Sequence, residues 1–288
     1  MNLAPLTVWL LLFSGVGAGF FGAMLGIGGG VLIIPALVLA FDVPIHVAVA
    51  ASLVAVIATS SAATSVYVAK GLTNMRLGMT LELATTVGGI TGGLLATRLP
   101  ATTLLIVFAM FLVPIAILLL RGRAERGDVV EAPAAARGRS DETRRGLGGV
   151  YYNPRTNEFL AYKTRRLPLG MGLSLVAGGL SGLLGVGGGI LKVPAMNLAM
   201  GIPIRVAAAT SNFMIGVTAA ASLVIYVQRG FLVPLVAAPV ALGVAAGALA
   251  GTVASPKVSS ALLARIFGIL LLVIAVQTLV RALGVGRV

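Results

Sequence analysis

Long apolar runs dominate the chain and limit what it can fold into. They extend over about residues 6–41, 44–69, 77–97 and 101–120, and then over 168–200, 203–228, 231–254 and 260–283. A run of roughly 18 or more apolar residues is typical of a helix that crosses a bilayer. We therefore predict an all-α polytopic membrane protein of about eight transmembrane segments.

The charged residues are concentrated between the two groups of apolar runs. Only 10% of the 288 residues are charged, and residues 121–166 contain 11 of the 21 Lys and Arg and 6 of the 8 Asp and Glu. Because this interval is polar and poor in aliphatic residues, we expect it to pack badly and to form a partly disordered cytoplasmic loop. The net charge of +13 therefore reflects loops and segment ends, and we predict no nucleic-acid partner.

The two hydrophobic halves are copies of each other. A single offset of 159 residues, without gaps, places Pro35 on Pro194 and keeps many glycines, prolines and polar residues in register. We predict a first membrane repeat at 1–120 and a second at 167–288, joined by the loop at 121–166. Duplication of this kind is typical of secondary transporters, which bind substrate where the repeats meet. Further matched pairs are Pro44 with Pro203, Ser52 with Ser211, Thr59 with Thr218, and Tyr67 with Tyr226.

Each half opens with a segment that is too long for one crossing. A continuous helix over 6–41 would be about 54 Å long, whereas the hydrocarbon core is about 30 Å thick. Glycines at 26–30 and 185–189 interrupt these segments, so we predict a long helix, a glycine turn and a shorter helix of roughly 12 residues in each half. If the shorter helix turns back, the repeats are antiparallel. The basic residues at the segment ends slightly favour parallel repeats.

The glycine turns are the first candidates for a binding site. Irregular backbone at membrane depth is tolerated only where it is buried in protein or lines a wet cavity. Each turn leads into a helix whose N-terminus offers N–H donors and the positive end of the helix dipole. We predict that both turns converge on a small anion, and close helix packing through small residues is the alternative. The turn residues concerned are Gly28, Gly29, Gly30, Gly187, Gly188 and Gly189.

Polar residues inside the apolar runs are candidates for the same site. Lys192 follows the second turn and would supply positive charge, while its counterpart Ile33 makes the site asymmetric. Hydroxyl and amide groups would donate hydrogen bonds to an oxyanion, although helix-to-helix hydrogen bonding is an equally good use for them. These groups belong to Ser52, Thr210, Ser211 and Asn212, with Asn197 and Thr218 as weaker candidates.

Glu82 is the only acidic residue well inside an apolar run. It either pairs with a base, such as Lys192 or Arg98, or carries a coupling proton. Its counterpart in the second repeat is Ala241, so the fold itself does not require an acid at this position.

Metal, cofactor and enzyme functions find little support in the composition. The chain has no cysteine and one histidine, which excludes a metal site built from Cys or several His ligands. Neither glycine turn is followed by the Lys-Ser/Thr of a phosphate-binding loop. We therefore expect no metal, no cofactor and no enzymatic activity.

Three stretches of the sequence carry a resemblance to a known family. They read GIGGGVLIIP at 26–35, GVGGGILKVP at 185–194 and TSNFM at 210–214. Together they resemble the paired signature of the sulfite exporter TauE/SafE family. The resemblance covers both hydrophobic halves and leaves out the central loop. It implies a permease built from a duplicated four-segment unit, with sulfite, sulfoacetate and related sulfur anions as the substrates of the family.

These observations predict a multi-pass permease of the inner membrane that moves a small anion by alternating access of two repeats. The predicted substrate is a sulfur oxyanion or organosulfonate, and the lipid bilayer is the other partner. An anion channel and a scaffold or assembly protein that transports nothing are the alternatives. The sequence does not fix the direction of transport or the oligomeric state.

Overall fold

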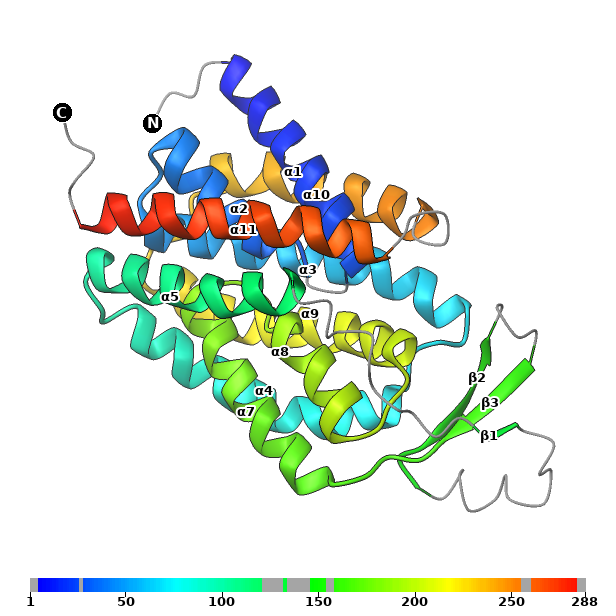
Figure 1. Cartoon of the computed structure of the whole chain (residues 1–288). Coiled ribbons are helices and arrows are strands. Elements are labelled where there is room, and N and C mark those ends of the chain that lie inside the picture. The colour runs from blue at the N-terminus through cyan, green and yellow to red at the C-terminus, as the bar shows by residue number, and fades with distance from the viewer. Residues whose placement is uncertain are drawn as a thin grey trace.

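The chain is almost entirely helical in the computed structural model, which describes residues 5–25, 28–120, 132–133, 146–153, 158–254 and 260–283 (Figure 1). The first half contains α1 (Pro5–Leu25), α2 (Gly30–Pro35) continued by the π-helical turn η1 (Ala36–Ala40), α3 (Ile45–Ala69), α4 (Met75–Ala96) and α5 (Ala101–Leu120). The second half contains α7 (Leu167–Leu184), α8 (Gly189–Pro194) continued by η3 (Ala195–Ala199), α9 (Ile204–Gln228), α10 (Pro234–Ala254) and α11 (Ser260–Ala282).

Six of the described helices are long and apolar enough to cross a membrane. The helices α4 and α5 are not among these six. The helix α4 is long enough, with 22 residues, but Glu82 makes it less apolar than they are, and the apolar part of α5 is shorter than theirs. The all-helical class is confirmed, while the figure of eight crossings stays a prediction. The six candidate spans are Leu6–Ala23, Ile45–Ala69, Leu167–Leu184, Ile204–Gln228, Pro234–Val253 and Arg265–Ala282.

The opening segment of each half is broken at its glycine turn, as predicted. The turns have positive φ angles, +74° at Gly28 in the first and +78° at Gly187 in the second. Side chains disfavour this backbone conformation, which explains why glycine is used. Two residues of the predicted first turn, Gly26 and Ile27, lie outside the described residues.

Contacts among the connecting loops define one end of the bundle. Arg281, at the end of α11, pairs with Asp42 beyond η1. The ring of His46, at the start of α3, lies 3.2 Å from the carbonyl oxygen of Leu99 and stacks on Phe231, which follows α9. The start of α3 and the ends of α4, α9 and α11 therefore lie together, and we call this the Asp42 end.

A second set of contacts defines the opposite end. The backbone N–H of Asn74, between α3 and α4, donates to Thr210 Oγ1 near the start of α9. The Asn74 side chain donates to the Tyr162 hydroxyl, and the Arg165 N–H donates to the Met200 carbonyl just after η3. The starts of α4, α7 and α9 therefore lie together, and we call this the Asn74 end.

The two halves run through the bundle in opposite directions. The helix α3 runs from the Asp42 end to the Asn74 end, and α9 runs the other way. The helix α1 is parallel to α10, with Gly15 beside Val240 and Gly19 beside Val244. Because α10 starts at the Asp42 end, α1 also enters from that end, and α2 with η1 returns to it. In the same way, α7 is parallel to α4 and α8 with η3 returns to the Asn74 end. The slight preference for parallel repeats was wrong, because both broken segments turn back.

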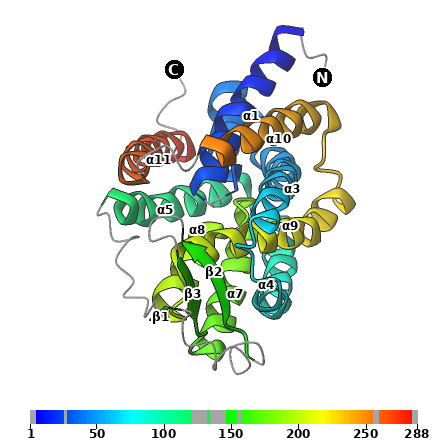
Figure 2. The same ribbon diagram turned by 90° about the vertical axis from the view of Figure 1, so that its right-hand side faces the viewer.

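The halves are also interwoven. As Figure 2 shows, α1 and α10 lie at the top, α4 and α7 at the bottom, α5 and α11 on the left, and α3 and α9 between them. Each of these pairs takes one helix from each half. Glycines make the closest approaches, since a Cβ on Gly19 would overlap the backbone of Val244 and one on Gly92 would overlap that of Gly179. Small residues of this kind let membrane helices pack tightly.

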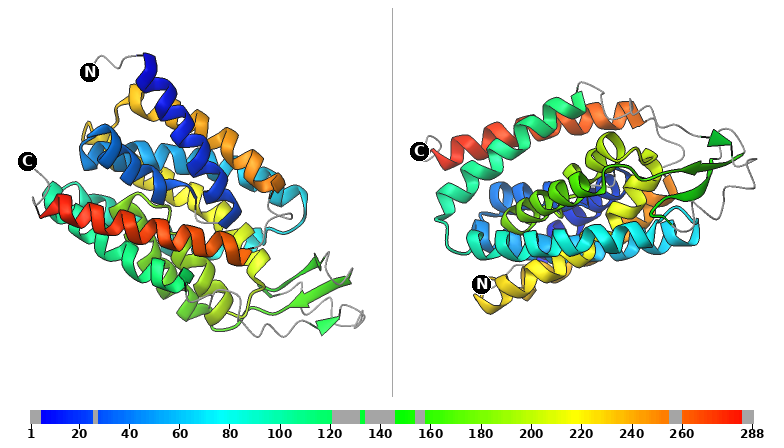
Figure 3. Two further views of the ribbon diagram at one scale, coloured as in Figure 1. Left: turned by 45° about the horizontal axis from the view of Figure 1, so that its top comes forward. Right: turned by 90° about the horizontal axis from the view of Figure 1, so that it is seen from below.

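Part of the central loop forms a small antiparallel sheet at the Asn74 end (Figure 3). Its strands are β1 (Ala132–Pro133), β2 (Gly149–Asn153) and β3 (Glu158–Tyr162), in the order β1-β3-β2. We expected poor packing in this interval, but Tyr151, Leu160 and Tyr162 are buried against α4, α9 and the end of η3. Alternation along a strand places these side chains on one face, a pattern that the composition of the loop conceals.

A pair of glycine substitutions tests the packing of α1 on α10. Gly19→Ala should lower the thermal unfolding midpoint of the detergent-solubilised protein by several degrees, because overpacking costs about 1–3 kcal/mol. Gly17→Ala is the matched control, since no atom lies within 4 Å of a Cβ built there. It should leave the midpoint unchanged or raise it slightly. Equal midpoints for the two variants would contradict this packing.

Candidate functional site

The two glycine turns meet at the middle of α3 and α9. A methyl group built on Gly187 would lie 2.7 Å from Ile215 Cγ2 and 2.9 Å from Val56 Cγ1, and one on Gly28 would contact the same two residues. Val56 and Ile215 are themselves counterparts at the offset of 159 residues, and both are fully buried. The Ser52 hydroxyl lies 2.8 Å from the Gly185 carbonyl oxygen, and so ties the start of the second turn to α3.

Two tyrosines, Tyr67 partly buried and Tyr226 fully buried, hold the ends of the broken helices. Tyr67, on α3, donates a hydrogen bond to the carbonyl of Ala23, and its counterpart Tyr226, on α9, donates to that of Gly182. These carbonyls lie in the last turn of α1 and of α7, where intrahelical partners run out. The matched tyrosines therefore satisfy matched backbone groups beside both turns.

A buried ion pair lies beside the second turn. Lys192 Nζ lies 3.7 Å from Glu82 Oε2, and the two side chains are 1% and 8% exposed. Thr218, on α9, connects them, because it accepts a hydrogen bond from Lys192 Nζ at 2.9 Å and donates one to Glu82 Oε1 at 2.6 Å. Glu82 therefore pairs with Lys192, one of the two bases that the sequence offered.

Two threonines on α4 complete the shell around the carboxylate. The Thr85 hydroxyl lies 2.7 Å from Glu82 Oε2, and the Thr86 hydroxyl lies 3.2 Å from Oε1. The symmetry-related place beside the first turn lacks this arrangement, because Ile33 and Ala241 occupy the positions that correspond to Lys192 and Glu82. The polar site is thus confined to one side of an otherwise symmetric centre.

The remaining predicted residues have different environments. The Thr210 hydroxyl accepts a hydrogen bond from the N–H of Asn74 at the Asn74 end of the bundle, away from the turns. Ser211 and Asn212 are buried, and neither Ser211 Oγ nor Asn212 Oδ1 has a hydrogen-bond partner. Ser211 lies one helical turn before Ile215 and on the same face of α9. Asn197 donates to the carbonyl of Ile202 and so ties η3 to the loop before α9.

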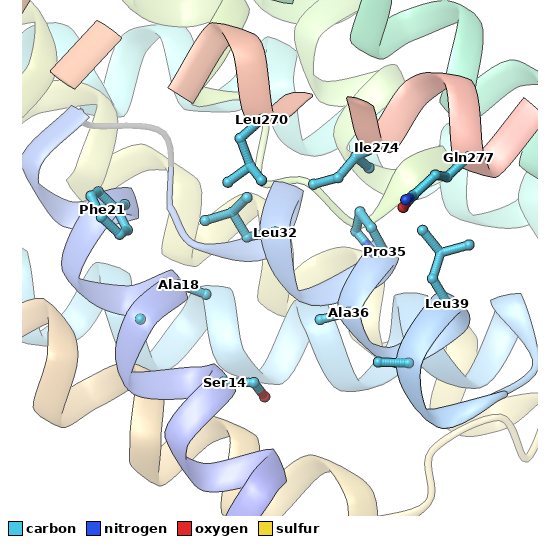
Figure 4. Close-up of a pocket in the computed structure, with 12 residues that line it drawn as sticks. Ser14, Ala18, Phe21, Leu32, Pro35, Ala36, Leu39, Leu270, Ile274 and Gln277 are labelled. Carbon is cyan, nitrogen blue, oxygen red and sulfur yellow. The ribbon is translucent and has the colours of Figure 1, made fainter. Parts of the chain in front are cut away.

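Two cavities lie away from this centre. One of about 370 Å³, between α1, α2 with η1, and α11, is shown in Figure 4. Among the described residues that line it, only Ser14 and Gln277 have polar side chains, so it suits hydrocarbon better than an anion. The other, of about 360 Å³, lies between the α3–α4 loop and the hairpin at the Asn74 end, where Asn74, Arg76 and Tyr162 line it.

Several residues of the centre escaped the sequence analysis. Thr85 and Thr86 stand three and four residues after Glu82, and this spacing places them on the same face of a helix, a signal that was present in the sequence. Ser60 donates to the backbone carbonyl of Asn212, and Val56 packs against both turns. Nothing local marks Val56 or Ser60, since each depends on a contact between the two halves.

Buried charges between helices, together with two broken segments that enter from opposite ends and meet centrally, define a multi-pass membrane protein of the transporter class. The family described as "Sulfite exporter TauE/SafE" matches residues 11–278, and the chain belongs to this family.

Relatives of nearly full length carry transporter names. A "Probable membrane transporter protein YunE" of Bacillus subtilis (strain 168) is 26% identical over 276 residues, which is 93% of this chain and 96% of the relative. A "Probable membrane transporter protein" of Xylella fastidiosa (strain 9a5c) is 25% identical over 272 residues, which is 93% of this chain and 94% of the relative. No solved structure gives a significant match.

Removing one charge or both tests the ion pair. Lys192→Met should destabilise the protein by about 3–5 kcal/mol, because it leaves the Glu82 carboxylate buried without its counter-ion. The double variant Lys192→Met/Glu82→Gln should regain most of that loss, since no charge is then left in the site. Thermal midpoints of the single and double variants measure both effects. If the loss of stability in the double variant equals the sum of the losses in Lys192→Met and Glu82→Gln, the two side chains do not interact.

Proposed function

We propose that this protein is a permease that moves a small anion across the inner membrane by alternating access of its two halves. The observation that carries this proposal is the meeting of both glycine turns at Val56 and Ile215. Two halves of opposite direction that contribute broken helices to one central place are a usual construction of secondary transporters. Rocking of one half against the other would open this centre first to one end and then to the other. No chemical reaction is involved.

We propose a sulfur oxyanion or an organosulfonate as the substrate, in keeping with the family description. Such an anion needs hydrogen-bond donors and positive charge in a dry site. Ser211 supports this choice, because its buried hydroxyl has no hydrogen-bond partner and can donate to an anion. Asn212 Nδ2 donates to the Ala208 carbonyl, and its second N–H is the donor that this side chain would offer. Lys192 supplies the positive charge, with backbone from the turns at 28–30 and 187–189 completing the site. The Ser52 hydroxyl links the two turns. Thr210 would contribute to the site only after its hydrogen bond with Asn74 breaks.

The Asn74 end is proposed to face the cytoplasm. The central loop leaves the bundle there, and this end carries Lys70, Arg76, Arg165 and Arg166 among its described residues. Cytoplasmic loops are enriched in Lys and Arg. The opposite end carries Arg98, Arg229 and Arg281 among its described residues, and the Arg281 charge is offset by Asp42.

Uptake into proteoliposomes tests the proposed function. Labelled sulfite, thiosulfate, sulfoacetate and sulfate are each offered to liposomes with and without the purified protein. At least one anion should enter faster than into empty liposomes, with saturation and counterflow exchange. If none does, the transport proposal fails. Flux that neither saturates nor shows counterflow would indicate a channel instead.

Variants of the same preparation test the proposed site. Asn212→Ala should slow uptake about tenfold or more, because a hydrogen bond to a charged group contributes about 1.5–3 kcal/mol. Lys192→Ala should abolish uptake. Ser65→Ala is the control, since this exposed hydroxyl on α3 bonds only to the Ala62 carbonyl of its own helix. Wild-type rates in both site variants would refute the site and leave transport standing.

A further inference from the structure

We propose that Glu82, Thr218 and Lys192 form a switch that admits the anion together with one proton. This inference rests on the proposed anion transport and specifies how it is driven. In the structure the positive charge of Lys192 is already matched by Glu82, at 3.7 Å between Nζ and Oε2. Lys192 therefore has no excess charge for a substrate until Glu82 is neutralised.

The hydrogen bonds around Glu82 have one consistent direction. An ammonium group only donates, an ionised carboxylate only accepts, and a hydroxyl does both. Lys192 accordingly donates to Thr218 Oγ1, Thr218 donates to Glu82 Oε1, and Thr85 donates to Glu82 Oε2. This arrangement fits the ionised form of Glu82.

A proton on Glu82 would rearrange this set of hydrogen bonds. The new O–H donates to Thr218 Oγ1, and the Thr218 hydroxyl turns to the Met214 carbonyl, which already lies 3.1 Å away. Lys192 then loses its counter-charge and keeps only a neutral neighbour. Because Lys192 is only three residues beyond Gly189, it is placed to hold an anion at the second turn.

The charge balance of the site couples the proton to the anion. The empty site holds one positive and one negative charge, which sum to zero. A monovalent anion added alone would leave one negative charge in a region of low dielectric, where an uncompensated charge is strongly disfavoured. A proton on Glu82 restores the sum to zero, and for a divalent anion it removes one of two excess charges.

Among the described residues, the helices around Glu82 supply no second carboxyl, and the hairpin that packs on α4 contributes the tyrosines Tyr151 and Tyr162. The helix α7 contains no ionisable residue, and α8 contributes only Lys192. On α9, Arg205 and Tyr226 stand near opposite ends, and the Tyr226 hydroxyl is held by the Gly182 carbonyl. On α4 itself, Arg76 lies at the start of the helix. The symmetry-related positions hold Ile33 and Ala241 in place of such a pair, so the switch occurs once and couples one proton to each anion.

Proton-driven accumulation in proteoliposomes tests this inference. Labelled thiosulfate and sulfate keep their charge between about pH 6 and 8, so protons that enter with them are not released by the anions themselves. The membrane potential is clamped at zero with potassium and valinomycin, and a trapped dye reports the internal pH. A gradient of one pH unit, acid outside, should drive about tenfold accumulation in the wild type, with internal acidification.

Glu82→Gln separates coupling from binding. The amide imitates the protonated acid, so counterflow exchange should persist while accumulation falls to about onefold and the dye signal is lost. Thr218→Val should weaken coupling, whereas Thr59→Val, at the counterpart position and bonded only to the Ala55 carbonyl, should not. If sulfite is the only anion of the panel that the protein transports, the difference in accumulation between Glu82→Gln and the wild type tests the switch.

The outcomes distinguish this inference from the proposed function. No anion flux in the wild type overturns transport itself. Wild-type flux of a fixed-charge anion without proton entry, or gradient-driven accumulation that survives Glu82→Gln, overturns the switch and leaves transport standing. The wild-type proton measurement decides even if Glu82→Gln does not fold.

Discussion

The need to satisfy backbone polar groups away from water governs this structure. Each broken helix leaves carbonyl and N–H groups without intrahelical partners, and lipid supplies none. The partners come from other helices, since Tyr67 serves Ala23, Tyr226 serves Gly182, and Ser52 on α3 binds Gly185 of the other half. The interweaving of α1 with α10 and of α4 with α7 follows, because each break must be buried by neighbouring helices.

The proposed function depends on a departure from this symmetry. The tyrosine hydrogen bonds and the packing of Val56 and Ile215 involve matched residues of both halves, but Lys192 and Glu82 occur once. A buried pair of opposite charges is costly to bring out of water and adds little to stability compared with apolar residues of similar size. Its retention beside the second turn, where Ile33 and Ala241 hold the symmetry-related positions, is more easily explained by transport than by folding.

Much of this fold could be predicted from the sequence because its signals are local or repeated. The positions of both breaks follow from glycines that permit positive φ at Gly28 and Gly187. The offset of 159 residues anticipates that Tyr67 and Tyr226 occupy equivalent places. It could not show that Thr210 is used by Asn74, or that Tyr151, Leu160 and Tyr162 are buried, because these contacts join segments far apart in the chain.

The sequence by itself determined the helical class and the two breaks and predicted the duplication, because lipid allows few backbone conformations and glycine and proline mark where helices stop. Only the tertiary structure decided the direction of the halves and the partner of Glu82. Both depend on whether the short helices cross the bundle or turn back, and local propensity is the same in either case. The return of α8 beside α4 and α9 brings Lys192 to Glu82 and Thr218.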